Sequence, residues 1–188
     1  MLTYEVEMLN VDVLTFVHFS PSHHNTISPA NLNTSTPQHN TIKTTIMTIN
    51  EAQDEVIEQF QDFTDWMDKY QLLIDLGGDL EPLDEKYKTE QNLIDGCQSR
   101  VWVQCDMTDD GRLVFTADSD ALIVKGIIAL LIQVISGHTP REILDADLYF
   151  IERIGLKDHL SPTRSNGLLA MVKQIRMYAL AYEAKANA

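Results

Sequence analysis

The stretch "DSDALIVKGIIALLIQVISG", residues 118–137, contains the most apolar run of the chain, residues 126–135. Its length and its scarcity of polar positions predict a helix that is buried on almost every side. Asp118 or Ser119 is placed to cap the start of this helix, and Gly137 to end it. About ten apolar residues are too few for a membrane-spanning helix, which needs roughly 20, so we expect this helix inside a soluble domain.

Two β-rich segments precede the buried helix. Residues 101–105 and 112–117 are rich in β-branched and aromatic side chains, and "TDDG", residues 108–111, has the composition of a tight turn. Together they predict an antiparallel hairpin, with Cys97 in a turn at the start of its first strand. Cys105 shares a strand face with two valines, which predicts that its side chain lies in the core.

An amphipathic helix is expected near the start of the domain. Residues 49–70 carry apolar side chains at steps of three and four, which predicts one continuous helix. Thr48 and Glu51 have capping-box spacing at its start. The next stretch, "LLIDLGG", residues 72–78, continues or restarts the helix, and its two glycines are expected to end it.

The C-terminal third of the chain predicts more helix than strand. "TPRE", residues 139–142, combines an N-cap, a proline at the first helical position and a glutamate at the third, which predicts a short helix. A third strand is expected around residues 148–152. Ser161 and Pro162 start a closing helix whose apolar stripe contains Leu168, Val172, Ile175, Ala179 and Tyr182. These elements indicate an α+β fold, a small antiparallel sheet with helices packed on it.

The N-terminal segment has a different composition from the rest of the chain. Residues 20–46 are mostly Ser, Thr, Asn, Pro and His, and such a segment cannot bury enough apolar surface to offset the entropy of ordering it. We predict that residues 1–46 are a disordered extension, either translated from upstream of the native start or dispensable. The functional domain is then residues 47–188. Glu5 and Glu7 argue against a secretory signal at the start.

Charge and cysteine content limit the function classes. Acidic residues outnumber basic ones by 28 to 14, which gives a formal charge of -14. Nucleic acid and anionic membranes would repel such a chain, so a protein partner with a basic surface is expected. Two cysteines cannot supply a four-thiolate metal or cluster site, and they do not form a CxxC motif; no metal site is predicted. We expect two free thiols and a reducing compartment, the cytoplasm.

Cys97 is the main candidate for a reactive side chain. A turn that offers backbone N–H groups, with Arg100 nearby, can lower the pKa of a thiol and make it nucleophilic. Gly96 permits a positive φ and the close approach of a second protein. Spacing alone nevertheless favours an ordinary loop cysteine. A hydrolytic pair with His138 or His159 is a further alternative, although nothing in the sequence brings either histidine to the thiol.

Three motifs resemble those of one known family. "GCQSRVWV" at 96–103, "DSDALIVKGIIALL" at 118–131 and "LSPTRSNGL" at 160–168 occur in the order and spacing of the SufE family. Its SufE/CsdE-like members are sulfur acceptors of cysteine desulfurases in iron–sulfur cluster assembly. The resemblance runs from about residue 60 to residue 178. It implies a SufE/IscU-like fold, although this chain lacks the three cysteines of an IscU-type scaffold.

The resemblance implies a persulfide carrier rather than a stand-alone enzyme. Cys97 would take the outer sulfur of a SufS- or CsdA-like desulfurase, stimulate that enzyme, and pass the sulfur to a SufBCD-like cluster scaffold. Pyridoxal phosphate would belong to the desulfurase only, and the carrier would need no cofactor. The apolar helix of residues 120–136 could supply a pocket that shelters the persulfide. A monomer or weak homodimer is expected.

The resemblance also assigns supporting residues. Those expected to shape the turn are Gly96, Gln98 and Ser99. Those expected to orient the loop or bind the partner are Arg100, Asp118, Asp120, Lys125 and Arg164. The alternative for the two aspartates is a helix cap, and for Arg164 a local ion pair.

Other functions remain open at this point. A CsdE-like carrier could deliver sulfur to another pathway, such as tRNA modification. A stand-alone thiol enzyme, a peroxidase or hydrolase, would turn over substrate without a partner. A structural adaptor would not need the Cys97 thiol at all.

Overall fold

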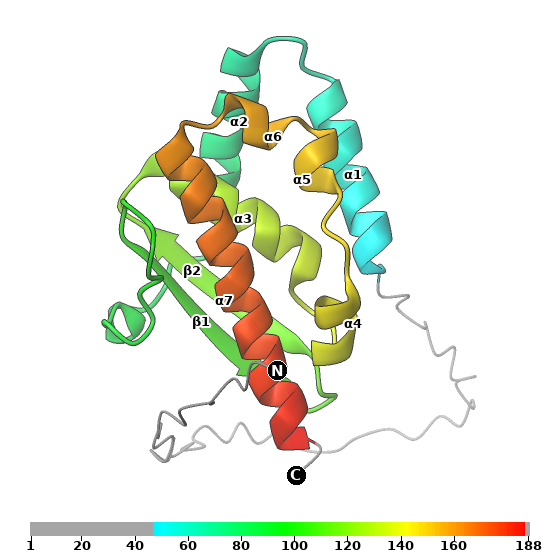
Figure 1. The fold of residues 1–188 in the computed structure, drawn as a ribbon, viewed down its shortest axis with the longest axis vertical. Helices are drawn as coiled ribbons and strands as arrows, with labels where there is room; N and C mark the ends of the chain where they lie inside the picture. The colour runs from blue at the N-terminus through cyan, green and yellow to red at the C-terminus, as the bar shows by residue number, and fades with distance from the viewer. Residues whose placement is uncertain (1–46, 187–188) are drawn as a thin grey trace, which may run out of the picture. The chain divides into compact units, whose positions relative to one another are not determined.

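The computed structural model describes residues 47–186, so the predictions for residues 1–46 lie outside the described residues. This part of the chain folds as two strands and a set of helices, which confirms the α+β class (Figure 1). The elements in chain order are α1 (Ile49–Gln61), α2 (Trp66–Asp79), the 3₁₀ helix η1 (Glu85–Tyr87), β1 (Val101–Met107), β2 (Leu113–Ser119), α3 (Leu122–Ile135), α4 (Pro140–Asp145), α5 (Phe150–Arg153), α6 (Leu156–His159) and α7 (Pro162–Ala186).

The predicted hairpin is present. β1 and β2 pair antiparallel with Val101 opposite Ser119 and Met107 opposite Leu113. Gly111 takes a φ of 78° in the connecting turn, a conformation that glycine adopts without strain. One face of the hairpin is buried, and it carries Val101, Val103, Cys105, Leu113, Phe115 and Ala117. Cys105 therefore lies in the core, as its position on the strand predicts.

The expected third strand is wrong, because residues 148–152 lead into the short helix α5 instead. The buried Gln53 side chain of α1 holds this segment: its amide donates to the Asp147 carbonyl at 3.0 Å, and its oxygen accepts from the Phe150 N–H at 3.2 Å. Both edges of the hairpin are also occupied by other residues. Asn92 and Ile94 bond to the edge of β1, and residues 137–138 bond to the edge of β2.

Helix α3 lies at the centre of the domain. Ten of its residues are buried, including Ile127, Ile128 and Leu131. In Figure 1 it runs between α2, α7 and the hairpin. Gly137 follows it with a φ of 82°, as predicted for its end. Within residues 47–186 no helix combines the length and the apolar character needed to cross a membrane.

The predicted cap of α3 is wrong. Ala121 precedes the helix without a side-chain cap, and both candidate caps belong to β2. The side chains of Asp118 and Ser119 instead bind residues from other parts of the fold. The Asp118 carboxylate binds Lys88 and Lys125, and the Ser119 hydroxyl donates to the Arg100 carbonyl at 2.9 Å.

The single helix expected over residues 49–70 is two helices in the structure. The capping box at Thr48 starts α1, and this helix ends at Gln61. Asp65 then caps α2 by accepting from the Met67 N–H at 2.8 Å. Gly77 and Gly78 lie inside α2 and do not end it, which corrects the prediction for this pair.

Gly77 has a packing role instead of a terminating one. A Cβ on Gly77 would lie 2.9 Å from the Gly126 nitrogen, and a Cβ on Gly126 would lie 2.0 Å from the Leu73 carbonyl oxygen. The backbones of α2 and α3 are therefore in direct contact, closer than any side chain would allow. This contact explains why both positions are glycine.

Helix α7 closes the domain along the hairpin. Leu168, Met171, Ile175 and Ala179 form its buried stripe, whereas Val172 and Tyr182 of the predicted stripe are only half-buried. Two hydroxyls fasten the helix to β1: Tyr178 donates to the Val103 carbonyl at 3.0 Å, and Tyr182 donates to the Cys105 carbonyl at 3.1 Å. The capping box predicted at Thr139 is also present at the start of α4.

The glycine contact gives a testable prediction. We expect Gly126→Ala to lower the free energy of unfolding by about 1–3 kcal/mol or more, because the new methyl group meets the backbone of α2. Gly78→Ala is the matched control, because Gly78 lies in α2 and a Cβ at this position would have no atom within 4 Å. It should raise stability by about 0.5–1 kcal/mol. Urea denaturation followed by circular dichroism measures both, and equal effects would contradict this account.

Candidate functional site

The cysteine turn is a loop closed at both ends by backbone hydrogen bonds. The Ile94 N–H donates to the Val101 carbonyl at 2.8 Å, and Gly96 turns the chain with a φ of 88°. At the other end the Arg100 N–H donates to the Asp120 carboxylate at 3.0 Å, and the Arg100 carbonyl accepts from the Asp120 N–H at 3.2 Å. The turn is thus tied to the loop that leads into α3.

The Cys97 side chain points from this turn onto α7. Its sulfur is half-buried and lies 3.6 Å from the Gly167 carbonyl oxygen, to which the thiol donates. A Cβ on Gly167 would lie only 3.3 Å from the same sulfur, which is tighter than ordinary van der Waals contact. The glycine therefore lets the sulfur rest on the backbone of the helix.

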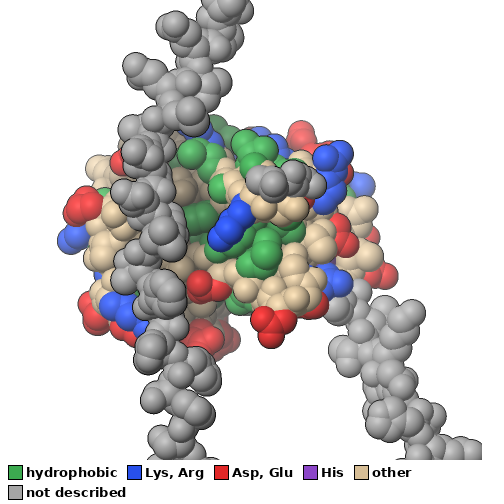
Figure 2. Space-filling view, turned by 90° about the horizontal axis from the view of Figure 1, so that it is seen from below, with side chains coloured by type: hydrophobic (Ala, Val, Ile, Leu, Met, Phe, Trp, Pro, Cys, Tyr) green, Lys and Arg blue, Asp and Glu red, His purple; other side chains and the backbone are tan. Residues whose placement is uncertain are grey.

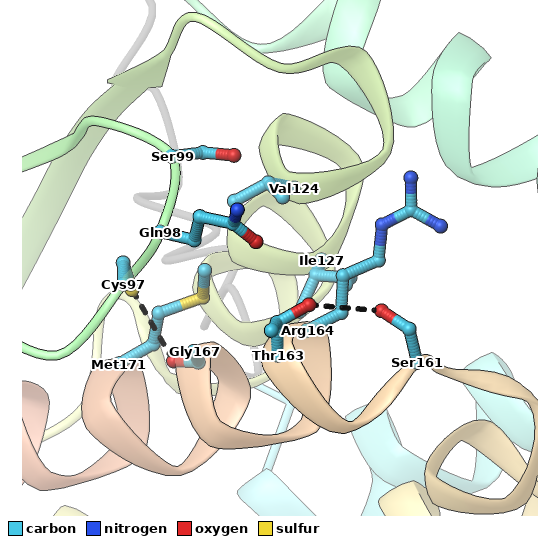
Figure 3. A pocket seen from close by; sticks show the side chains of 10 residues that line it. All are labelled: Cys97, Gln98, Ser99, Val124, Ile127, Ser161, Thr163, Arg164, Gly167 and Met171. Carbon is cyan, nitrogen blue, oxygen red and sulfur yellow. Dashed lines mark hydrogen bonds between the residues drawn. The ribbon is translucent and has the colours of Figure 1, made fainter.

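A cavity of about 370 Å³ opens beside the sulfur (Figure 3). Its apolar wall comes from Val124 and Ile127 of α3 and from Met171 of α7. Gln98 and Ser99 of the turn also line it. The polar residues that line it from the start of α7 and just before it are Ser161, Thr163 and Arg164.

Burial raises the pKa of the Cys97 thiol. This corrects the expectation that Arg100 lowers it. The Arg100 guanidinium lies over the Trp102 ring, 4.8 Å from its centroid, and reaches the Glu90 carboxylate at 4.0 Å. An ordinary thiol has a pKa of about 8.5, so the resting Cys97 is protonated at neutral pH.

The predicted site residues fall into three groups. Cys97, Gln98, Ser99 and Arg164 line the cavity, with Gly96 beside it in the turn. Arg100 and Asp120 hold the end of the turn. Among the described residues Arg164 makes no ion pair, so the local pair considered for it is absent there.

Asp118 and Lys125 form the third group, away from the cavity lining. The Asp118 carboxylate lies 2.9 Å from the Lys125 ammonium and 3.0 Å from that of Lys88. Burial alone would raise the pKa of Asp118, but the hydrogen bonds from the two lysines outweigh it and hold the pKa below its usual range. This cluster ties β2 to α3 and to the segment after η1.

Sequence reasoning missed one wall of the cavity. The apolar helix α3 was expected to shelter the thiol, but the residues that α7 contributes, Thr163, Gly167 and Met171, were not identified. Their spacing of four residues places all three on one face of that helix, and this is the signal that could have found them.

The two described histidines lie outside the cavity lining. The His138 ring is buried, with a nitrogen 2.9 Å from the Met47 carbonyl oxygen. The His159 ring stacks on Trp66, with 3.8 Å between centroids. Within residues 47–186 no three His, Cys, Asp or Glu side chains are grouped so as to hold a metal ion.

The raised pKa of Cys97 predicts slow alkylation at neutral pH. We expect the iodoacetamide rate to keep rising with pH beyond the ordinary thiol pKa, since burial disfavours the thiolate. Cys105 is the internal control: burial, with a smaller contribution from Asp106, raises its pKa to about 12, so it should react only on unfolding. Intact mass against time, from about pH 7 to 10, measures both. A Cys97 rate that is already constant at neutral pH would show a lowered pKa instead.

Gly167 offers a second test. Gly167→Ala should push the Cys97 sulfur off the helix and speed its alkylation at mildly alkaline pH several-fold, because the new methyl group takes up the space of the sulfur. Gly78→Ala, a helix position without neighbours, should leave the rate unchanged. An unchanged rate in Gly167→Ala, with thermal stability retained, would mean that the contact does not hold the sulfur.

The chain is similar to known proteins in both sequence and fold. Residues 54–179 match the family model SufE, described as an Fe-S metabolism associated domain. The fold is similar to the solution structure of a hypothetical protein from Thermus thermophilus, with a TM-score of 0.59 at 20% sequence identity. That similarity covers 71% of this chain and 96% of the other. At 20% identity this structural similarity shows a shared fold and nothing about function.

Proposed function

The chain belongs to the SufE family of Fe–S metabolism associated domains, and from this premise we propose that Cys97 carries sulfur as a persulfide between a cysteine desulfurase and an iron–sulfur cluster scaffold. The pyridoxal phosphate chemistry that releases sulfur from cysteine stays on the desulfurase. The carrier supplies the thiol, the turn that presents it and the cavity beside it.

The transfer is a thiol–persulfide exchange. The Cys97 thiolate attacks the outer sulfur of the persulfide on the partner's cysteine, and a new sulfur–sulfur bond forms. The bond inside the partner's persulfide breaks, and the partner cysteine leaves as a thiolate. Delivery is a second exchange, in which an acceptor thiolate attacks the outer sulfur on Cys97 and Cys97 leaves as a thiolate, so no oxidant or reductant is consumed.

The observation that carries this proposal is the cavity beside the Cys97 sulfur. One water molecule takes up about 30 Å³, and an added sulfur atom is of similar size. A cavity of about 370 Å³ therefore has room for the outer sulfur of a persulfide. Val124, Ile127 and Met171 would cover it with apolar side chains, which keeps competing thiols and oxidants away.

Burial also provides a way to keep the Cys97 thiol unreactive until the partner docks. In the cavity the thiol is protonated and half-hidden, since burial raises its pKa. A partner that draws the turn outward would expose the sulfur and remove that burial, so the thiolate would form at the moment of docking. The bonds that must give way are those of Arg100 with Asp120 and Ser119.

A carrier fits the site better than a stand-alone thiol enzyme. Such an enzyme activates its thiol with an adjacent base or with an environment that lowers the pKa of the thiol. Neither described histidine lines the cavity, and burial raises the pKa of the Cys97 thiol instead of lowering it. A carrier needs no base of its own, because its reaction takes place in the partner's active site.

Sulfur acceptance tests the proposal directly. The purified chain is mixed with a cysteine desulfurase and free cysteine, and intact mass is recorded for wild type, Cys97→Ser and Cys105→Ser. We expect wild type and Cys105→Ser to gain sulfur that a reductant removes, and Cys97→Ser to gain none. Alanine release by the desulfurase should also rise with wild type and not with Cys97→Ser. Sulfur on Cys97→Ser, or on no variant, would overturn the proposal.

A further inference from the structure

The outer face of α7 carries a groove that the sulfur chemistry does not use. Most of its lining is apolar, and three of its side chains are more than half exposed: Leu169 at 57%, Met177 at 52% and Leu180 at 59%. Val172 and Leu144, the latter from α4, complete the apolar surface. The distance along the helix from Leu169 to Leu180 is about 16 Å, roughly three turns.

The groove and the thiol cavity lie on opposite sides of the same helix. An α-helix turns about 100° per residue, which places Leu169 and Leu180 roughly opposite Gly167 and Met171. The first pair lines the groove and the second pair lines the cavity. A protein seated in the groove would therefore leave the mouth of the cavity open.

The charges in the groove are unusual for this chain. Lys173 and Arg176 line it, and no acidic residue does, although acidic residues outnumber basic ones by 28 to 14 overall. Arg176 uses one N–H on the Ala146 carbonyl at 3.0 Å, and among the described residues neither cation forms an ion pair. Figure 2 looks at the end of the molecule where α7 finishes, and it shows a group of hydrophobic side chains in the middle with a basic side chain among them, and both acidic and basic side chains around them.

We propose that this groove docks an amphipathic helix of a partner protein, a helix whose apolar stripe meets Leu169, Met177 and Leu180 and whose flanking residues are acidic. Helix-in-groove binding uses apolar anchors at i, i+3 or i+4 and i+7, about two turns of helix, and the groove is long enough for these. Carboxylates beside the stripe would pair with Lys173 and Arg176. The docked partner would hold the carrier while Cys97 remains free to exchange sulfur.

Two other occupants fit the charges less well. A second copy of the chain would place Lys173 and Arg176 against the same cations of its neighbour, and like charges in a contact repel. An anionic membrane would attract these two cations but would repel a chain with a formal charge of -14. The acidic helix satisfies both the apolar stripe and the cations.

The test uses the full chain and a synthetic peptide of about four helical turns, with leucines on one face and glutamates beside them. A second peptide keeps the leucines and replaces the glutamates by lysines. We expect the acidic peptide to bind, measured by fluorescence anisotropy, and the basic peptide to bind at least about tenfold more weakly. Leu180→Glu and Lys173→Glu should each weaken the acidic peptide by a similar factor, whereas Met67→Glu, at an exposed position on α2, should not.

Further arms separate this inference from the proposed function and from the other occupants. Cys97→Ser should bind the peptide as wild type does, and the peptide should leave Cys97 alkylation unchanged. Equal binding of both peptides, or of neither, would overturn the proposal. So would sedimentation of the chain as a dimer that Leu180→Glu dissociates, which would assign the groove to a second copy. Binding to anionic phospholipid vesicles in place of the peptide would assign it to a membrane surface.

Discussion

The contact between the backbones of α2 and α3 at Gly77 and Gly126 determines where everything else in the domain can lie. Gly126 stands between Val124 and Ile127, the two residues of α3 that line the thiol cavity. Because the glycines let the helices touch, the depth of α3 is fixed, and with it the distance of that apolar wall from the cysteine turn. The hairpin and α7 then pack on this helix, and its close contact with α2 resists a shift in its position.

The Cys97 site places two requirements in opposition, since a persulfide must be protected and a thiol must react. Burial against Gly167 serves the first by covering the sulfur, and it opposes the second by raising the pKa. Both requirements can be met at different times if the turn moves, because the sulfur is then covered at rest and exposed when a partner docks. Its attachments at Arg100 and Asp120 are a few hydrogen bonds near the surface, which is the kind of restraint that a docking partner can break.

Sequence reasoning succeeded where the signal was local. The hairpin, the capping boxes at Thr48 and Thr139, the buried α3 and the long α7 all follow from turn residues, caps and periodicity. The errors concern contacts between elements. The glycine at position 77, the caps assigned to Asp118 and Ser119 and the strand expected at 148–152 were decided by partners elsewhere in the fold. The α7 wall of the cavity was missed for the same reason. The division of residues 49–70 into two helices is an exception, because the cap at Asp65 is local.

The hydroxyls of Tyr178 and Tyr182 have a consequence for how the protein behaves at high concentration. A two-stranded hairpin presents unpaired backbone groups along its edge, and such an edge can template strand addition between molecules and lead to aggregation. Here the two phenols occupy the carbonyls of Val103 and Cys105, and residues 92–94 cover the rest of that stretch. The sheet can therefore consist of only two strands without its edge pairing with the strands of other copies of the chain.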